Sequence, residues 1–546
     1  MQSSPLLRCL VSVVIGLALH CAPAALSAQS VGSGEFRVAG TVVNKIGGHP
    51  LAGARVLLGD ARNRENVQSM VTTDDGRFAF AARAGKYSLT AEKRGFLTTA
   101  YKGHEQFSTA IVTGAGFDTE NLVLHLAPNA VLSGKVFDES GEPVRDATVL
   151  VYREDHASGI SQIRPVLQST TDDQGAYEAT PLGDGTYFVS VHAKPWYAVH
   201  PFKLPGVGPA AVDSSLDVAY PITYYGDATE ADEATPIPIR GGDRIEADIH
   251  LGPVPSLHLI VHTGEDVTHG FAMPMFQKQS FDGMARVETA EARMTSPGTF
   301  ELTGITPGRY TVRALGSRNG QMPEPTEVDL SSNTSELDMS SGNPVSTVTA
   351  KVQVVGEAKL PVPLGVAMRN AKGRVVTGAN VNPEGEATFR NVVAGEYTFV
   401  AGSPTKPYSV KIASGSGAPG GRKLTVPAGS SLQVTLSLVG GETTIEGVAQ
   451  RSGKPFAGAM VVLVPKDPES NHEQFRRDQS DMDGTFSLLQ VVPGSYTVVA
   501  IENGWDLDWG KPAILARYVK MGQPINVTSQ AKGSTQLATP VEVQPK

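Results

Sequence analysis

The chain has 546 residues, 40% of them hydrophobic, and a net charge of −9. The charges are spread along the chain and form no basic stripe that would match a phosphate backbone, so nucleic acid is not an expected partner. The only cysteines are Cys9 and Cys21. Both fall in an N-terminal segment that is expected to be removed, so the mature chain should have no disulfide, zinc–thiolate site or cysteine nucleophile.

Residues 1–28 have the pattern of a secretory signal peptide. Arg8 supplies the charged region, residues 10–19 form an apolar core, and a zone of small residues ends at Ala28. His20, directly before Cys21, argues against lipid attachment at that cysteine. The apolar core is too short to span a bilayer and no later stretch is apolar enough, so no transmembrane segment is expected after signal removal. The sequence therefore predicts an extracytoplasmic protein, whether secreted, periplasmic or on the cell surface.

One short motif, Gly-x-Tyr, occurs five times along the rest of the chain. After each Tyr, apolar residues alternate with mostly polar ones, as in Leu89 and Ala91, and this period of two predicts a half-buried strand. The five copies are Gly85-Lys86-Tyr87, Gly185-Thr186-Tyr187, Gly308-Arg309-Tyr310, Gly395-Glu396-Tyr397 and Gly494-Ser495-Tyr496. We expect the recurring Tyr to be structural, with its hydroxyl bonded to a nearby turn, as in a tyrosine corner.

A glycine precedes each of these tyrosines by 11 or 12 residues and is followed within a few residues by an aromatic. Three of these glycines follow aspartates, and Gly and Asp together are typical of tight turns. Each copy therefore predicts one hairpin, made of a turn, a strand, the Gly-x-Tyr motif and a second strand. The five copies predict five domain-sized modules of about 100 residues. The glycines are Gly76, Gly175, Gly298, Gly385 and Gly484.

In chain order, the predicted modules are residues 29–128, 129–251, 252–342, 343–440 and 441–546. Short strands with frequent turn signals predict an all-β fold, a tandem array of about five antiparallel β-sandwich modules, each folding alone and strung to the next. The second module carries an aromatic and proline-rich insertion from Trp196 to about Gly242, in which Pro236 and Pro238 predict an edge strand. The third and fourth are degenerate copies. The fifth contains the two predicted helices, 468–477 and 512–521, each beginning with a proline.

Three of the modules resemble the carboxypeptidase regulatory-like domain. The first does so through Gly40-x-Val42, residues 50–54, Asp75-Gly76-Arg77-Phe78 and Gly85-Lys86-Tyr87. The second and fifth repeat the pattern, with Asp173-Gln174-Gly175-Ala176-Tyr177 and Asp483-Gly484-Thr485-Phe486 at the turn. The resemblance implies a prealbumin-like sandwich, related to starch-binding-like folds, of a kind that accompanies secreted peptidases and surface proteins and has no catalytic residues. The whole chain is similar to secreted bacterial proteins built only of such modules.

Candidate catalytic and metal sites are few. His262-Thr263-Gly264-Glu265 has the His-x-x-Glu form of a zinc carboxypeptidase, but it follows a strand and lacks a surrounding catalytic domain. His258 and His262 share one face of that strand without a third ligand, so a solvated sheet face is the favoured interpretation. Asp478, Asp481 and Asp483 are interpreted as a hairpin turn, with a calcium loop as the alternative. No catalytic residue, metal or other cofactor is predicted.

Aromatic residues form the candidate ligand site. Phe96, Trp196 and Trp505 each follow a recurring Tyr by nine residues, and so would stand at one pole of their modules. Exposed rings there could stack on the apolar face of a sugar. The alternative is that each ring plugs the end of its own core or the joint with the next module. The predicted carbohydrate-binding residues are Trp196, Tyr224, Tyr225, Trp505 and Trp509.

These patterns together predict a non-enzymatic, extracytoplasmic protein that presents surfaces or acts as a scaffold. Two alternatives stay open: a carbohydrate-binding protein, and an accessory subunit of a secreted peptidase or of an envelope transport system. The expected partners are accordingly glycans or proteins of the cell envelope.

Overall fold

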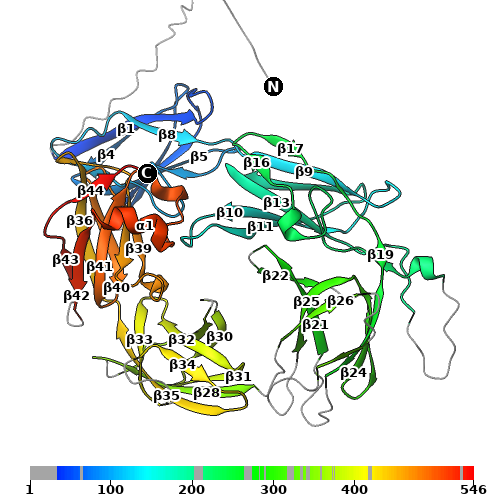
Figure 1. The fold of residues 1–546 in the computed structure, drawn as a ribbon. Helices are drawn as coiled ribbons and strands as arrows, with labels where there is room; N and C mark the ends of the chain where they lie inside the picture. The colour runs from blue at the N-terminus through cyan, green and yellow to red at the C-terminus, as the bar shows by residue number, and fades with distance from the viewer. Residues whose placement is uncertain are drawn as a thin grey trace, which may run out of the picture.

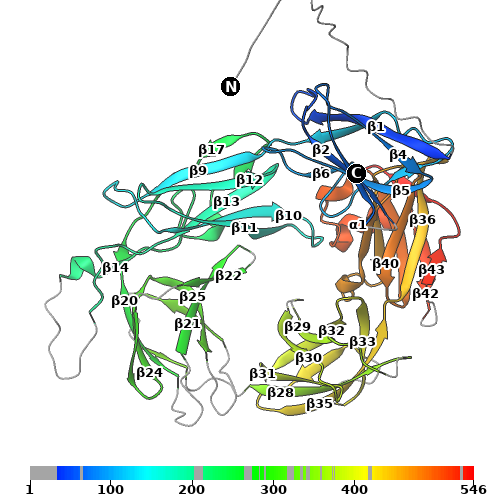
Figure 2. The same cartoon turned by 180° about the vertical axis from the view of Figure 1, so that it is seen from behind.

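The computed structural model describes residues 34–61, 65–201, 213–263, 273–281, 283–287, 291–315, 325–331, 336–339, 345–356, 359–371, 373, 375–415, 421–528 and 533–546. The predicted signal peptide, and with it Cys9 and Cys21, lies outside these residues. Figures 1 and 2 show a chain built almost entirely of strands. The predicted all-β, multi-module fold class is confirmed.

Five sandwiches follow one another, and we name them units 1 to 5. In unit 1, one sheet contains β4 (Arg77–Arg83), β1 (Glu35–Asn44) and β8 (Leu122–Leu126), and the other contains β3 (Val67–Val71), β2 (Arg55–Asp60), β5 (Gly85–Glu92), β6 (Thr99–Ala100) and β7 (Ile111–Thr113). In unit 2, the first sheet contains β12 (Ala176–Leu182), β9 (Ala130–Phe137), β17 (Arg244–Glu246) and β18 (Ile249–His250). The second sheet of unit 2 contains β11 (Gln162–Thr170), β10 (Thr148–Asp155), β13 (Gly185–His192), β15 (Thr223–Tyr224) and β16 (Ile237–Ile239).

Units 3 and 4 repeat this plan. Unit 3 has one sheet of β23 (Glu291–Ser296), β24 (Thr299–Ile305), β20 (Leu257–His262) and β27 (Glu336–Asp338), and a second of β22 (Gly283–Val287), β21 (Met273–Ser280), β25 (Gly308–Leu315) and β26 (Thr326–Leu330). A short pair, β14 (Val218–Ala219) and β19 (Val254–Pro255), lies between units 2 and 3. Unit 4 is one continuous curved sheet of β30 (Val375–Asn380), β29 (Gly365–Asn370), β32 (Gly395–Gly402), β33 (Pro407–Gly415), β35 (Ser431–Gly440), β28 (Ser346–Val354) and β31 (Glu386–Val392), with β34 (Lys423–Val426) on β32.

Unit 5 also forms one continuous sheet and adds a helix. Its strands are β37 (Lys454–Pro455), β36 (Thr443–Arg451), β44 (Val541–Gln544), β41 (Gly494–Ile501), β38 (Met460–Pro465), β39 (Arg476–Gln479), β40 (Thr485–Val491), β42 (Gln523–Val527) and β43 (Gly533–Gln536). Helix α1 (Pro512–Val519) packs Leu515 and Tyr518 into a second core of this unit. Each of the five units has its own buried apolar core, as its size allows.

The recurring tyrosines have the structural role predicted for them. In every unit the hydroxyl donates a hydrogen bond to the carbonyl oxygen four residues earlier, and the ring is at most 8% exposed. Each ring folds back over the glycine of its own motif, so that a Cβ there would lie 3.1–3.8 Å from ring atoms. The bonds join Tyr87 to Arg83 (3.1 Å), Tyr187 to Gly183 (2.9 Å), Tyr310 to Thr306 (2.7 Å), Tyr397 to Val393 (2.8 Å) and Tyr496 to Val492 (2.7 Å).

The upstream glycines also lie where the turns were predicted. Their φ angles are between +71° and +84°, in the left-handed region that favours glycine. In unit 5 the turn closes with the Gly484 N–H donating to Asp481 O at 2.9 Å, so the aspartates here form a hairpin turn as predicted.

The predicted edge strand and the two predicted helices can be compared directly with the structure. The edge strand is confirmed, because β16 pairs only with β13 and places Pro238 opposite Thr186. Of the two helices, 512–521 corresponds to α1, whereas the helix predicted over 468–477 is wrong. That segment forms a 3₁₀ turn, His472–Gln474, and then β39, which pairs with β38. Sheet pairing across the unit outweighs the local helix signal of a proline followed by polar residues.

The five units do not form an extended string. In both views the chain curves round an open centre and brings unit 5 back against unit 1, so that its described ends lie in neighbouring units (Figures 1 and 2). Hydrogen bonds between residues about 370–400 positions apart join the two units, for example from Lys86 to Asp481. The expectation that each module is joined only to the next is therefore wrong at this contact.

Candidate functional site

The predicted aromatic site does not form a row of exposed rings. Trp196 is 88% exposed, but Tyr224 is 1% and Trp509 7% exposed. Tyr225 and Trp505 are half-buried. The expectation that these rings are presented to solvent is thus wrong for Tyr224 and Trp509, because other units or elements cover them.

Tyr224 lies in the joint between units 2 and 3, and the neighbouring Tyr225 faces the core of unit 2. The Tyr224 hydroxyl bonds to Ser280 Oγ at 3.0 Å, and its ring lies edge-on to Phe281 at 5.4 Å. Burial raises the pKa of the Tyr224 hydroxyl to about 12, which keeps it protonated. The insertion of unit 2 therefore packs against unit 3 and forms part of the joint between them.

Trp505 lies in the contact between units 1 and 5. Its ring stacks on His104 of unit 1, with centroids 5.0 Å apart and an interplanar angle of 5°, and approaches Phe107 at 5.5 Å. Trp509 faces the second core of unit 5, and the Arg477 guanidinium lies 4.3 Å from its ring centre. Both rings thus follow the alternative interpretation: Trp505 plugs a joint between units, and Trp509 packs in a core of its own unit.

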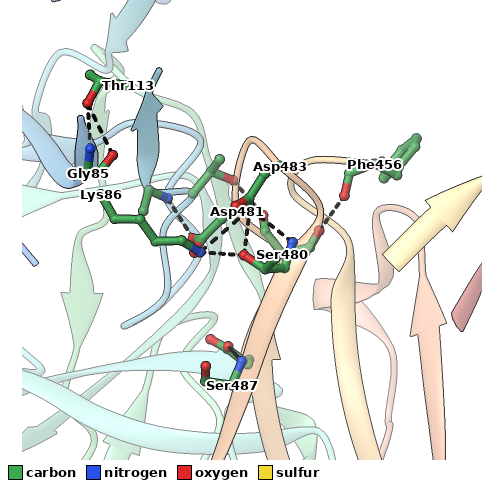
Figure 3. A network of polar contacts seen from close by, with 12 residues as sticks. Gly85, Lys86, Thr113, Phe456, Ser480, Asp481, Asp483 and Ser487 are labelled. Atoms are coloured by element: carbon green, nitrogen blue, oxygen red, sulfur yellow. Dashed lines mark hydrogen bonds and ion pairs between the residues drawn. The ribbon is translucent and has the colours of Figure 1, made fainter. Parts of the chain in front are cut away.

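A charged cluster forms the centre of the same contact, which we call the 1–5 joint (Figure 3). Lys86 Nζ lies 2.6 Å from Asp481 Oδ2 and 3.5 Å from Asp483 Oδ1, and it also donates to Thr485. The other carboxylate oxygen of Asp481 accepts the backbone N–H of Ala110 at 2.9 Å. The variable residue of the first Gly-x-Tyr motif and the turn aspartates of unit 5 are therefore partners.

A second layer of hydrogen bonds covers the edge strand β39. Gln479 donates to Lys102 O at 2.7 Å and to Thr109 Oγ1 at 2.8 Å, and its carbonyl oxygen bonds to His104 at 3.0 Å. Arg477 pairs with Glu105 at 2.6 Å. Gln479 and Thr109 are buried, so these bonds are shielded from water and hold the loop 101–110 of unit 1 on the edge of unit 5.

The hairpin between β10 and β11 of unit 2 also reaches unit 5. The Gly510 N–H donates to Gly159 O at 2.6 Å, and His156 Nδ1 lies 2.8 Å from Asp508 Oδ1. A Cβ at Gly510 would lie 2.8 Å from Gly159 O, so only glycine fits this close approach. Units 1, 2 and 5 thus contact one another.

Burial changes the acidity of the aspartates at the 1–5 joint. It raises the pKa of Asp478 to about 6, although that side chain accepts the Ser487 N–H at 2.6 Å. Burial also raises the pKa of Asp481, while Lys86 acts in the opposite direction. Burial therefore disfavours the charged form of both aspartates, and the Lys86 ammonium offsets this at Asp481. In the part of the chain that the structure describes, no three His, Cys, Asp or Glu residues are arranged to hold a metal ion.

The histidines considered from the sequence have carboxylate partners. His258 Nε2 lies 2.6 Å from Asp217 Oδ2, and His262 Nε2 lies 2.7 Å from Glu336 Oε1. They do not share a ligand, as a metal pair would. The Glu265 of the His-x-x-Glu pattern lies outside the described residues.

A further contact joins units 4 and 5. Glu473 lies between Arg422, at 2.7 Å, and Arg369, at 3.4 Å. These three side chains line a cavity of about 800 Å³ where units 2, 4 and 5 meet. Lys86 bonds to a residue 395 positions away and Glu473 to one 51 positions away, and for that reason neither could be identified from local motifs.

Comparison with known proteins supports the sequence resemblance for unit 1. Residues 37–123 match the family model of the carboxypeptidase regulatory-like domain. No curated protein matches the chain.

Among solved structures, those similar to the chain include the following three. The Bacillus anthracis TIE protein is 11% identical, covering 75% of this chain and 76% of that one with a TM-score of 0.17. A Streptococcal ancillary pilin is 11% identical, with coverages of 52% and 98% and a TM-score of 0.20. GBS52, the minor pilin of Streptococcus agalactiae, is 14% identical, with coverages of 40% and 96% and a TM-score of 0.19. Within the described residues, no helix has the length and apolarity needed to cross a membrane.

Proposed function

We propose that the protein is a non-enzymatic, extracytoplasmic scaffold whose five units are held in a closed arrangement by the 1–5 joint. The single observation that carries this proposal is the contact of Lys86 with Asp481, at 2.6 Å, between the first and last units. Carboxypeptidase regulatory-like domains are non-catalytic modules, which agrees with a structural role for unit 1. The signal pattern of residues 1–28 supports an extracytoplasmic location.

The closed arrangement suits a protein that holds several surfaces in fixed relation. Interfaces between units in one chain are commonly small and permit relative motion, but here unit 5 contacts units 1, 2 and 4. Such a platform would position partners of the cell envelope, including a peptidase or transport component for which it serves as an accessory subunit. Of the predicted sugar-stacking rings, only Trp196 is openly exposed, so a carbohydrate-binding role would depend on that residue.

Small-angle X-ray scattering of the mature chain tests the closed arrangement. We expect a maximum dimension that matches five units curved on themselves, well below that of five units end to end. Lys86→Glu places like charges at the joint and should lengthen the particle, and the swapped pair Lys86→Glu with Asp481→Lys should shorten it again.

Arg37→Glu is a matched control, because Arg37 pairs with Glu120 within unit 1 and both side chains are more than half exposed. It should leave the particle size unchanged. An extended wild-type chain would refute the proposal, as would a Lys86→Glu variant of unchanged dimension.

A further inference from the structure

Strands β38 and β41 of unit 5 are apolar on both faces. Along β38, Val461 and Leu463 face the core of the sandwich, whereas Val462 and Val464 face the second core on the outer side of the sheet. Helix α1 packs on this outer side, and within the described residues no other unit has an α-helix. With eight residues α1 is about 12 Å long, whereas the eight residues of β41 span about 26 Å, so the helix alone cannot cover the strand along its length.

A groove of about 640 Å³ lies beside α1, over the adjoining ends of β38, β41 and β42. Val464, Leu515 and Val519 line it and also belong to the second core or pack against it, so the groove is continuous with that core. Val464 is 4% and Leu515 1% exposed, which places them at the bottom of the groove. A concave, mostly apolar site of this size is typical of small-molecule binding.

The lining of the groove offers a ligand few hydrogen bonds. Four of its residues are prolines, which have no backbone N–H to donate. Two of its polar side chains, Ser495 and Asn526, bond to each other at 3.1 Å. A peptide or a sugar would therefore leave many of its own polar groups unpaired here, which is costly. The four prolines are Pro465, Pro468, Pro512 and Pro524.

Lys466 is the only charged side chain among the residues that line the groove. The residue is exposed at the rim, where its backbone N–H donates to Ser495 O at 2.9 Å. Its ammonium forms no ion pair with any residue that the structure describes. The groove therefore combines an apolar floor with one positive charge at its edge, and the complementary ligand is apolar with a single negative end.

From this arrangement we infer that unit 5 binds a free fatty acid or a similar single-chain anionic amphiphile. The alkyl chain lies on Val464, Leu515 and Val519, and the carboxylate accepts hydrogen bonds from the Lys466 ammonium. Each methylene that enters the groove is worth about fourfold in affinity. Because the apolar floor lies below an exposed rim, a single chain can reach it, whereas the flat surface of a bilayer cannot. The site gives the scaffold a ligand that its arrangement of units does not imply.

Calorimetric titration of the mature protein with octanoate, decanoate and dodecanoate tests the site. We expect one-to-one binding whose affinity rises by about 15-fold for each step of two carbons until the groove is filled. Ala516 is exposed on α1 and lines the groove, so Ala516→Trp should fill it and weaken dodecanoate binding by at least tenfold. Ala513→Trp is the matched control, because Ala513 is exposed on the same helix but does not line the groove.

A second pair of variants tests the head group. Lys466→Gln should weaken decanoate binding by about two- to fivefold, the size expected for an exposed ion pair, and leave the binding of uncharged decanol unchanged. Lys520→Gln removes an exposed lysine just after α1, outside the groove, and should bind both compounds as wild type does.

The inference has clear failures. Absence of saturable dodecanoate binding would overturn it, and so would an affinity that Ala516→Trp leaves unchanged or that Ala513→Trp lowers equally. Equal affinities of the wild type for decanol and decanoate would overturn the anionic head. The groove lies within unit 5, and none of its lining residues takes part in the 1–5 joint, so this inference and the closed arrangement fail separately.

Discussion

Removal of the Trp505 ring is the most direct perturbation of the 1–5 joint. The ring stacks on His104 and approaches Phe107, both in unit 1, and is half-buried. Half of a tryptophan is about 100 Å² of apolar surface, worth about 2.5 kcal/mol at 25 cal/mol per Å², and an aromatic pair adds up to about 1 kcal/mol. Trp505→Ala should therefore lower the free energy of opening the joint by about 2–3 kcal/mol.

Two backbone amides report on that opening directly. The Ala110 N–H donates to Asp481 Oδ1 at 2.9 Å, and the Met482 N–H donates to Ala110 O at 3.2 Å, so both bonds exist only across the joint. Hydrogen exchange at these amides should accelerate by about 30- to 150-fold in Trp505→Ala, because each 1.4 kcal/mol is a factor of ten. Amides inside the unit 5 sheet, such as those of β38, should keep their wild-type rates.

Trp196→Ala provides the control, since it removes the same ring from an exposed position. It should leave exchange at both amides unchanged. Unchanged exchange in Trp505→Ala would refute the assignment of this ring to the joint. Acceleration spread evenly over all of unit 5 would show that the ring stabilises the unit and not its contact.

Three further outcomes are expected. Asp478 has its pKa raised to about 6 from an ordinary 3.8, so the folded state holds its proton more tightly and loses stability as the pH rises from 4 to above 6. Asp478→Asn should therefore be more stable than wild type by about 3 kcal/mol at pH 8 and equal to it near pH 3.5, as measured by denaturant titrations at the two pH values. A pH-independent difference would contradict this. Tyr310→Phe should destabilise unit 3 by about 1–2 kcal/mol, because it leaves the buried Thr306 carbonyl without a donor, whereas Tyr87→Phe, at a longer and more exposed bond, should cost less in the same calorimetric assay; equal losses would argue against the corner bond. Glu473→Gln removes the charge between Arg422 and Arg369 and should accelerate exchange along β34 while leaving β1 unaffected; protection unchanged at β34 would exclude a role for Glu473 in the contact of units 4 and 5.

The parts of the fold that could be predicted are those determined within a hairpin. Gly-x-Tyr and the upstream glycine are only 11 or 12 residues apart, and their steric requirements act locally, so the corner bond and the positive φ at Gly484 follow from the residues themselves. The helix expected over 468–477 failed because β39 is determined by its pairing with β38 and by the loop of unit 1 that covers it.

The joints between units could not be predicted because they depend on contacts between residues far apart in the sequence. Lys86 and Asp481 are 395 residues apart, and a lysine in a strand or an aspartate in a turn is common on any surface. The spacing of Trp505 did indicate a pole of the sandwich, but it could not show whether that pole faced solvent or a neighbour. Exposure is a property of the arrangement of units, which no single repeat encodes.

The parallel pairing of the first and last strands has a mechanical consequence. β1 runs parallel to β8 and β36 to β43, so each of these units receives the chain at one end and releases it at the other. A pull applied to the two chain ends therefore acts on units 1 and 5, which are fastened to each other, and loads that fastening before it stretches units 2 to 4. Rupture of the contacts that unit 5 makes with units 1 and 2 would then let the chain between them extend, so the protein would lengthen only above a threshold force.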